Sequence, residues 1–204
     1  MRYVLAVLMG YLLGCSSMAY YIGKMKKKDI RTAGSGNLGA SNATVLFGWG
    51  AGVMVALHDI GKAVLAVLLA KWLFPELEYA GAAAGVACVL GHIFPFYLGF
   101  KGGKGLASYF GMTLALNWKL ALIVAAVIVL ATLITDFISV GALSSIVVVP
   151  AYMGFTTHNL LLVAILGVAT VVMFGKHWEN IVRIAKGQEI GLRRTVKGTD
   201  RVDQ

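Results

Sequence analysis

Charged residues and cysteines are both scarce in this chain. Charged side chains make up 13% of the 204 residues and hydrophobic ones 59%, so polar groups are too few to cover a soluble globule of this size. The two cysteines, Cys15 and Cys88, lie inside apolar runs, which argues against a disulfide framework and predicts buried free thiols. We therefore expect an all-α, polytopic transmembrane helix bundle.

Several common catalytic patterns are also missing. There is no Ser-His-Asp order, no zinc-ligand spacing and no cysteine beside a base, and His58 and His158 stand isolated in the sequence. Gly105 occupies the position where a Walker A loop needs Ser or Thr to hold magnesium. We therefore expect no nucleotide, no metal and no cofactor.

Apolar runs near the length of a bilayer crossing recur along the chain. We predict a short interfacial segment at about 43–50, a turn at 75–78, and about seven crossings, at 3–23, 50–74, 79–99, 105–116, 120–135, 137–154 and 160–175. The first run continues to Ile22, so we expect it to be kept as a span although Leu12-Leu13-Gly14-Cys15 looks like a lipoprotein cleavage site.

The basic residues are clustered, which predicts the orientation of the bundle. The chain has 18 Lys and Arg against 9 Asp and Glu. Positive charge favours the cytoplasmic side, so we expect the N-terminus outside, the C-terminus cytoplasmic, and no nucleic acid as partner. No internal repeat is visible, and we treat 1–204 as a single domain. The clusters are Lys24, Lys26, Lys27, Lys28 and Arg31, then Lys101 and Lys104, then Lys176, Arg183, Lys186, Arg193, Arg194, Lys197 and Arg201.

A polar, glycine-rich segment at 34–42 follows the first basic cluster. Its sequence is Gly34-Ser35-Gly36-Asn37-Leu38-Gly39-Ala40-Ser41-Asn42. Glycines let several backbone N–H groups point at one anion, and hydroxyl and amide side chains add further donors. We expect a phosphate cradle, with a flexible loop between helices as the alternative. Its expected phosphate contacts are Ser35, Gly34, Gly36, Asn37, Gly39 and Asn42.

A second glycine-rich loop, Lys101-Gly102-Gly103-Lys104-Gly105, follows His92-Ile93-Phe94-Pro95. Glycines beside a lysine allow N–H groups and an ammonium to converge on a phosphate. The alternative is a loop whose lysines touch lipid headgroups. His92 precedes the loop, which favours a functional role over that of a satisfied interior histidine.

Two further groups place polar side chains on one helix face. Asp59 and Lys62 are three residues apart in an apolar run, and we expect a pair that orients the loops or simply neutralises itself. His177, Asn180 and Arg183 recur every third residue and could handle a proton, an oxyanion and a phosphate. A solvated amphipathic helix end would look similar.

Four groups of residues, in order, resemble one family. They are Asp29-Ile30-Arg31 with 34–42, Asp59-x-x-Lys62, Gly91-His92-x-Phe94-Pro95 with 100–105, and His177-x-x-Asn180-Ile181-x-Arg183 with Gly187-x-Glu189. The ordered set is similar to the bacterial acyl-phosphate-dependent glycerol-3-phosphate acyltransferases. The resemblance implies transfer of a fatty acyl group from acyl phosphate to sn-glycerol 3-phosphate, giving lysophosphatidic acid and phosphate, the first step of phospholipid synthesis.

The resemblance also implies partners, a location and site residues. The partners are acyl phosphate, glycerol 3-phosphate, membrane lipid and the soluble enzyme that makes acyl phosphate; the location is the cell inner membrane, with the site at its cytoplasmic face. We expect catalytic roles for Ser35, His92, Lys104, His177 and Asn180, phosphate contacts from Gly34, Gly36, Asn37, Gly39, Asn42, Lys101, Gly102, Gly103 and Arg183, and orienting roles for Asp59, Lys62 and Glu189.

Some positions depart from the family's pattern. Ser41 replaces a threonine, Ala63 a glycine, and Val45 and Trp178 common arginines, so which cation serves which phosphate stays open. The proton of the attacking hydroxyl could pass to His177, to His92 or to the departing phosphate. We do not expect Ser35 to be a covalent nucleophile, because no base is visibly paired with it. The alternative function is a membrane transporter of phosphate or an organophosphate.

Overall fold

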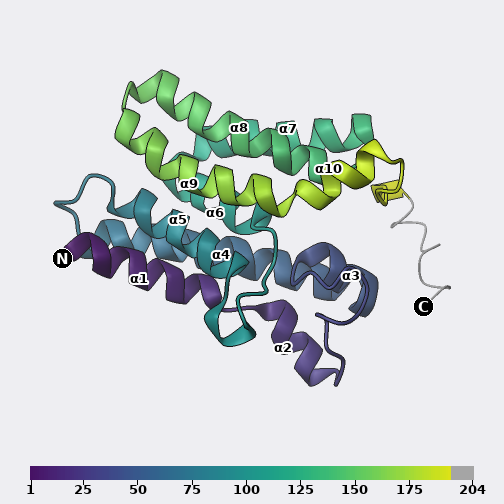
Figure 1. Ribbon diagram of the computed structural model, residues 1–204. Helices are drawn as coiled ribbons and strands as arrows, with labels where there is room; N and C mark the ends of the chain where they lie inside the picture. Colours follow the sequence, from purple (N-terminus) through teal and green to yellow (C-terminus); the bar gives the residue numbers. More distant parts are fainter. Residues whose placement is uncertain (194–204) are drawn as a thin grey trace. The chain divides into compact units, whose positions relative to one another are not determined.

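The computed structural model describes residues 1–193, and all regular structure in that part of the chain is helical (Figure 1), which confirms the expected all-α class. The α-helices are α1 (Arg2–Cys15), α2 (Met18–Met25), α3 (Ala40–Phe47), α4 (Trp49–Leu73), α5 (Ala80–Ile93), α6 (Leu106–Leu116), α7 (Trp118–Thr135), α8 (Ile138–Thr157), α9 (Leu160–Lys176) and α10 (Trp178–Ala185), with a 3₁₀ helix η1 at Phe96–Leu98. The basic residues Arg194, Lys197 and Arg201 lie outside the described residues.

The helices have the length and composition of a membrane bundle. Within residues 1–193, five stretches are long and apolar enough to cross a bilayer, and α9 with α10, bent by 45°, makes a sixth if counted as one span. Apolar side chains such as Leu57, Leu68 and Leu130 are more than half exposed, as expected where lipid replaces water. The remaining apolar helix, α6, has 11 residues, about 16 Å at ~1.5 Å per residue. Seven crossings therefore stay a prediction.

The first predicted span, 3–23, is not one continuous helix. α1 ends at Cys15, and α2 begins after Ser17, whose hydroxyl accepts a hydrogen bond from the Tyr20 backbone N–H at 3.3 Å. Serine is a good N-cap because its oxygen satisfies an N–H that the helix leaves unpaired. The apolar run predicted the extent of the span well, but two consecutive serines inside it mark a break.

The boundaries of the next elements agree with the sequence prediction. A short helix, α3, precedes the long α4, and Gly48 separates them with a φ of 91°. The turn expected at 75–78 lies between α4 and α5. Gly48 is both the C-cap of α3 and the N-cap of α4, and glycine adopts this positive φ without strain because it has no Cβ.

Residues 1–118 form one compact unit, in which α1, α4 and α5 pack side by side (Figure 1). Small residues allow α1 to approach α5 closely. A Cβ added at Gly10 would lie 2.2 Å from the Ala84 carbonyl oxygen, and one at Gly14 would lie 2.1 Å from that of Cys88. Both cysteines are buried and free, as predicted. This close packing brings the C-terminal ends of α1 and α5 close to the polar residues in the middle of α4.

The second unit begins at Lys119 and contains most of α7 together with α8, α9 and α10. α8 packs against α9, and the Thr170 hydroxyl of α9 donates to the Ile146 carbonyl of α8 at 3.0 Å. α9 ends at Lys176, and the chain bends by 45° at His177 before α10 begins at Trp178. The bend separates an apolar helix from a short amphipathic one.

Candidate functional site

A buried ionic cluster connects α4 with the end of α5. Lys62 Nζ lies 2.8 Å from Asp59 Oδ1, one turn away on α4, which confirms that the two side chains are neighbours. His92 of α5 joins them, with its Nδ1 3.0 Å from Lys62 Nζ and 3.3 Å from Asp59 Oδ1. Asp59 is 2% exposed, and Lys62 and His92 are each 6% exposed. Buried charges are costly unless they are paired and hydrogen-bonded, as these are.

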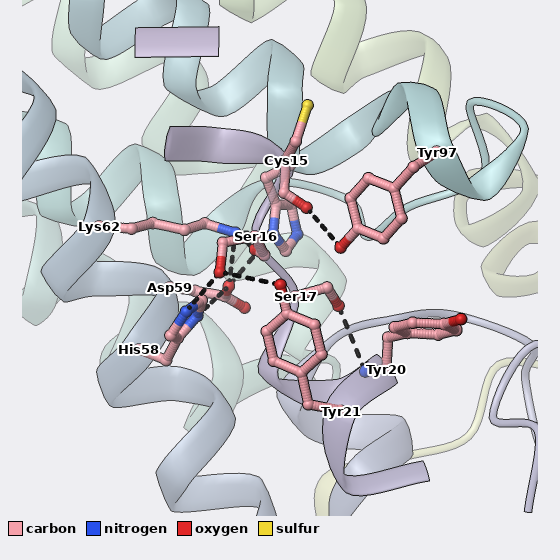
Figure 2. Close-up of polar contacts among 10 residues, drawn as sticks. Cys15, Ser16, Ser17, Tyr20, Tyr21, His58, Asp59, Lys62 and Tyr97 are labelled. Atoms are coloured by element: carbon pink, nitrogen blue, oxygen red, sulfur yellow. Dashed lines mark hydrogen bonds and ion pairs between the residues drawn. The ribbon is translucent and has the colours of Figure 1, made fainter. Parts of the chain in front are cut away.

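The break in the first span is part of the same cluster (Figure 2). Lys62 Nζ donates to the Ser16 carbonyl at 2.7 Å, and the Tyr97 hydroxyl donates to the Cys15 carbonyl at 2.9 Å. Helix ends leave carbonyls without intrahelical partners, and in a membrane such groups must be satisfied by protein. The cluster supplies these partners from two other elements.

His58 is not isolated, contrary to the sequence prediction. Its Nε2 lies 3.0 Å from the Ser16 hydroxyl and its Nδ1 lies 3.5 Å from Asp59 Oδ1 (Figure 2). Neither His58 nor Ser16 could be recognised from the sequence, because the contact joins residues 42 positions apart. A signal was present, however, since polar residues inside apolar runs usually have partners.

The 34–42 segment is organised by one buried amide. Asn42 Nδ2 lies within 3.2 Å of the carbonyl oxygens of Ile30, Ala33 and Asn37, and its Oδ1 accepts from the Ser35 N–H at 3.0 Å. The polar atoms of Asn42 therefore stabilise the backbone conformation of the loop, and the contact of Asn42 with phosphate stays a prediction. The Gly36 N–H donates to the Ala33 carbonyl just before the segment, so two of the expected cradle donors, the N–H groups of Ser35 and Gly36, have partners close by in the chain. The Ser35 side chain is exposed.

Asp29 and Arg31 form an exposed ion pair just before this segment. The Arg31 guanidinium contacts both carboxylate oxygens, with its closest nitrogen 2.8 Å from Asp29 Oδ2. These hydrogen bonds lower the pKa of Asp29 to about 2. The pair therefore stays charged at neutral pH and leaves little of the Arg31 charge uncompensated.

The lysine loop folds back onto the end of α5. The Gly102 N–H donates to the Ile93 carbonyl at 3.0 Å, and the Gly103 N–H donates to the His92 carbonyl at 3.1 Å. These two N–H groups were expected to point at a phosphate, and here they satisfy the helix end instead. Lys101 is exposed and Lys104 is half-buried. The loop is thus a fixed support for its lysines, and its predicted phosphate contacts stay predictions.

In the second unit, the Glu189 carboxylate contacts two residues of the predicted polar stripe, Asn180 and Arg183. Its Oε1 accepts from Asn180 Nδ2 at 2.5 Å and from the Ser139 hydroxyl at 3.1 Å, and its Oε2 accepts from Arg183 Nε at 2.7 Å. The orienting role expected for Glu189 stays a prediction. Sequence reasoning missed Ser139, 50 positions away. The catalytic role of Asn180 and the phosphate contact of Arg183 stay predictions.

The position of the proton on neutral His177 follows from one hydrogen bond. Its Nδ1 lies 2.8 Å from the Met173 carbonyl oxygen. A carbonyl can only accept, so Nδ1 carries the hydrogen, and the lone pair of the neutral ring is on Nε2. His177 is buried. Its Nε2 therefore has the form that a general base needs.

Acid should weaken the Glu189 cluster. Burial raises the pKa of Glu189, but the hydrogen bonds from Asn180, Arg183 and Ser139, with the Arg183 charge, outweigh burial and lower it below its usual 4.5. A lowered pKa stabilises the fold above about pH 4.5, and this contribution disappears as pH falls through the folded-state pKa. Hydrogen bonds to a charged group are worth about 1.5–3 kcal/mol, so we expect Glu189→Gln to lower the thermal midpoint by roughly 3–10 °C at neutral pH.

The measurement is thermal unfolding in detergent between pH 7 and pH 3. The difference between the wild type and Glu189→Gln should shrink toward pH 3. Glu179→Gln is the matched control, because the Glu179 side chain is 83% exposed, and it should change the midpoint by less than a degree or two. A pH-independent difference would show that the carboxylate charge is not involved.

Comparison with known proteins gives consistent results. A family model described as glycerol-3-phosphate acyltransferase matches residues 4–187. The glycerol-3-phosphate acyltransferase of Coxiella burnetii (strain CbuG_Q212) is 40% identical over 190 residues, covering 93% of this chain and 97% of the relative. Glycerol-3-phosphate acyltransferase 1 of Oceanobacillus iheyensis is 36% identical over 201 residues, covering 94% and 96%.

Two solved structures share the fold. Both are of PlsY (YgiH), described as an integral membrane glycerol 3-phosphate acyltransferase. The glycerol 3-phosphate form has a TM-score of 0.87 and 30% identity, and covers 94% of this chain and 96% of that one. The lysophosphatidic acid form has a TM-score of 0.86 and 29% identity, and covers 97% and 100%.

Proposed function

Because the chain belongs to the glycerol-3-phosphate acyltransferase family, we propose that it transfers a fatty acyl group from an acyl phosphate to sn-glycerol 3-phosphate. Acyl transfer to glycerol 3-phosphate, with lysophosphatidic acid as product, is supported by 40% identity over nearly the whole chain and by solved structures in the glycerol 3-phosphate and lysophosphatidic acid forms. Acyl phosphate as donor is our proposal. It is supported by the family resemblance and by Tyr97 in place of the aspartate of the H-x4-D motif.

The proposed reaction is a direct transfer. The acceptor hydroxyl oxygen forms a bond with the acyl carbonyl carbon, the bond from that carbon to the phosphate oxygen breaks, and phosphate leaves. A mixed anhydride is already activated, so the protein mainly has to hold two anions and stabilise the developing oxyanion. The hydroxyl proton passes to a base, and His177 Nε2 carries the lone pair for that step.

We assign the phosphate contacts within residues 1–118 to the exposed Ser35 hydroxyl and to Lys104. Both belong to segments that hydrogen bonds hold in place. The Asn42 side chain bonds to the backbone of the Ser35 segment, and backbone N–H groups of the Lys104 loop donate to carbonyls at the end of α5. A fixed support lowers the entropy lost when a ligand is bound. In the second unit we assign an oxyanion contact to Asn180 and a phosphate contact to Arg183, which Glu189 orients.

The donor is tested by turnover of the purified protein. With palmitoyl phosphate and labelled glycerol 3-phosphate we expect lysophosphatidic acid and free phosphate, and no product when palmitoyl coenzyme A or palmitoyl acyl carrier protein replaces the acyl phosphate. Product from either thioester would contradict the donor assignment. Phosphate uptake into liposomes without acyl transfer would support the transporter alternative instead.

Removing the proposed phosphate contacts should slow the reaction. A hydrogen bond to a charged group is worth about 1.5–3 kcal/mol, so we expect Lys104→Ala and Ser35→Ala each to lower kcat/KM by roughly tenfold to a hundredfold. Lys27→Ala is the control, because Lys27 is an exposed cation of the first basic cluster, and it should lose less than threefold. Equal losses of kcat/KM in Lys27→Ala and Lys104→Ala would show that Lys104 contacts lipid headgroups and not the substrate phosphate.

We further propose that the chain lies in the cell inner membrane with its C-terminus and its active site on the cytoplasmic side, and that α6 completes a seventh crossing. The support is the basic clustering and the apolar character of α6. Single cysteines introduced at Arg2 and Lys186, with Cys15 and Cys88 buried, should be labelled from opposite sides. Labelling of both from one side would refute seven crossings.

A further inference from the structure

The ammonium of Lys62 has as many acceptors around it as it has hydrogens. Its Nζ lies 2.7 Å from the Ser16 carbonyl oxygen, 2.8 Å from Asp59 Oδ1 and 3.0 Å from His92 Nδ1. An ammonium has three N–H donors and no lone pair. With Lys62 6% exposed, water is a poor substitute for any of the three. Each N–H therefore has one acceptor, and the third acceptor is a ring nitrogen of His92.

An imidazole nitrogen accepts a hydrogen bond only when it carries no hydrogen. A hydrogen on His92 Nδ1 would face an N–H of Lys62 across 3.0 Å, and an imidazolium would place a second positive charge at that distance. Asp59 Oδ1 lies 3.3 Å from the same nitrogen and has a lone pair for such a hydrogen even while it accepts from Lys62. That contact is longer than the 3.0 Å to Lys62 Nζ, however, and a hydrogen on Nδ1 would turn the third N–H of Lys62 toward another hydrogen. The geometry thus favours an unprotonated Nδ1.

We propose that Lys62 is a positioning residue that holds His92 as the neutral tautomer with its hydrogen on Nε2. His92 then offers a hydrogen-bond donor at Nε2, and its only lone pair is directed at Lys62. His92 cannot accept the substrate proton in this form. The two histidines left open by the sequence therefore differ, since neutral His177 has its hydrogen on Nδ1.

The donor edge of His92 lies against the lysine loop. A Cβ added at Gly103 would lie 2.1 Å from His92 Nε2 and 2.7 Å from its Cε1, so the α-carbon before Lys104 packs on this edge of the ring. A donor here suits an anionic oxygen held by the loop, either of phosphate or of the developing oxyanion. This part of the inference rests on the proposed function, whereas the tautomer does not.

The tautomer is tested by nitrogen NMR of the full-length protein, labelled with ¹⁵N-histidine and reconstituted in lipid nanodiscs. The chain has 4 histidines, so comparison with His92→Gln assigns the His92 signals. We expect one protonated nitrogen, Nε2, and one Nδ1 with the shift of a hydrogen-bonded lone pair. In Lys62→Met we expect the hydrogen to move to Nδ1, facing Asp59. A wild-type His92 with hydrogen on Nδ1, or on both nitrogens, would overturn the proposal even if Lys62→Met does not fold.

Activity separates a donor from a base. A glutamine amide can place an N–H near the position of Nε2 but cannot take a proton, whereas the shorter asparagine reaches only the position of Nδ1. We expect His92→Gln to keep activity within about tenfold of the wild type and His92→Asn to lose about a hundredfold. Equal, severe loss in both variants would contradict the donor role. Absence of any turnover in the wild type would refute the proposed function and leave the NMR result standing.

Discussion

Replacing Asp59 with alanine is expected to destabilise the protein by about 3–5 kcal/mol, because the Lys62 ammonium would stay buried without its carboxylate. Asp59 is 2% exposed, and its Oδ1 lies 2.8 Å from Lys62 Nζ and 3.3 Å from His92 Nδ1. A loss of this size is a large part of the stability of an ordinary domain. We expect poor yield of folded protein and a thermal midpoint in detergent lowered by roughly 6–20 °C.

A double substitution distinguishes a lost ion pair from a general packing defect. Asp59→Leu with Lys62→Leu removes both charges and should be more stable than Asp59→Ala. It should recover only part of the wild-type stability, since the Ser16 carbonyl and His92 Nδ1 lose their donor. An Asp59→Ala protein as stable as the wild type would show that Lys62 can lose its proton or reach solvent at little cost.

Adding a methyl group at Gly103 is expected to lower kcat/KM at least a hundredfold. The new Cβ would lie 2.1 Å from His92 Nε2, far inside contact distance, so either the ring or the loop has to move. The ring is held by Lys62 at 3.0 Å, and the loop by the Gly103 N–H on the His92 carbonyl at 3.1 Å. A displacement of about 1 Å in a reacting site can cost a hundredfold in rate.

The control for Gly103→Ala is Gly61→Ala in the middle of α4. Nothing lies within 4 Å of a Cβ added at Gly61, and alanine is the better helix former, so this variant should keep full activity and gain up to about 1 kcal/mol of stability. Combining Gly103→Ala with His92→Ala should cost much less than the sum of the two single losses, because the shared clash disappears. Additive losses would place the effect of the methyl group elsewhere.

Features that depend on residues close together in the chain could be predicted from the sequence. The extent of the long apolar helices, the short helix before α4 and the Asp59–Lys62 pair all follow from periodicity and composition within a few turns. The ordered motifs were enough to indicate the family. The contact between Lys62 and His92 could not be predicted, because it spans 30 positions and depends on how α4 packs against α5.

Polar residues whose partners are backbone groups were the hardest to interpret. Asn42 looked like a ligand contact because an amide in a glycine-rich segment can bind an anion, yet its side chain satisfies the backbone of its own loop. Gly102 and Gly103 looked like anion donors, yet their N–H groups satisfy the end of α5. A sequence shows which groups can form hydrogen bonds but not which acceptors the fold leaves unsatisfied nearby.

The break between α1 and α2 constrains the order in which the protein is assembled during synthesis. Two carbonyls at that break, those of Cys15 and Ser16, receive their donors from Tyr97 and Lys62. When the first segment leaves the ribosome, neither donor has been made, and an unsatisfied carbonyl in hydrocarbon costs several kcal/mol. The nascent segment should therefore enter the bilayer as an unbroken helix, or wait at the lipid–water interface. It can acquire its native break, with both carbonyls satisfied, only after about 80 more residues have been translated.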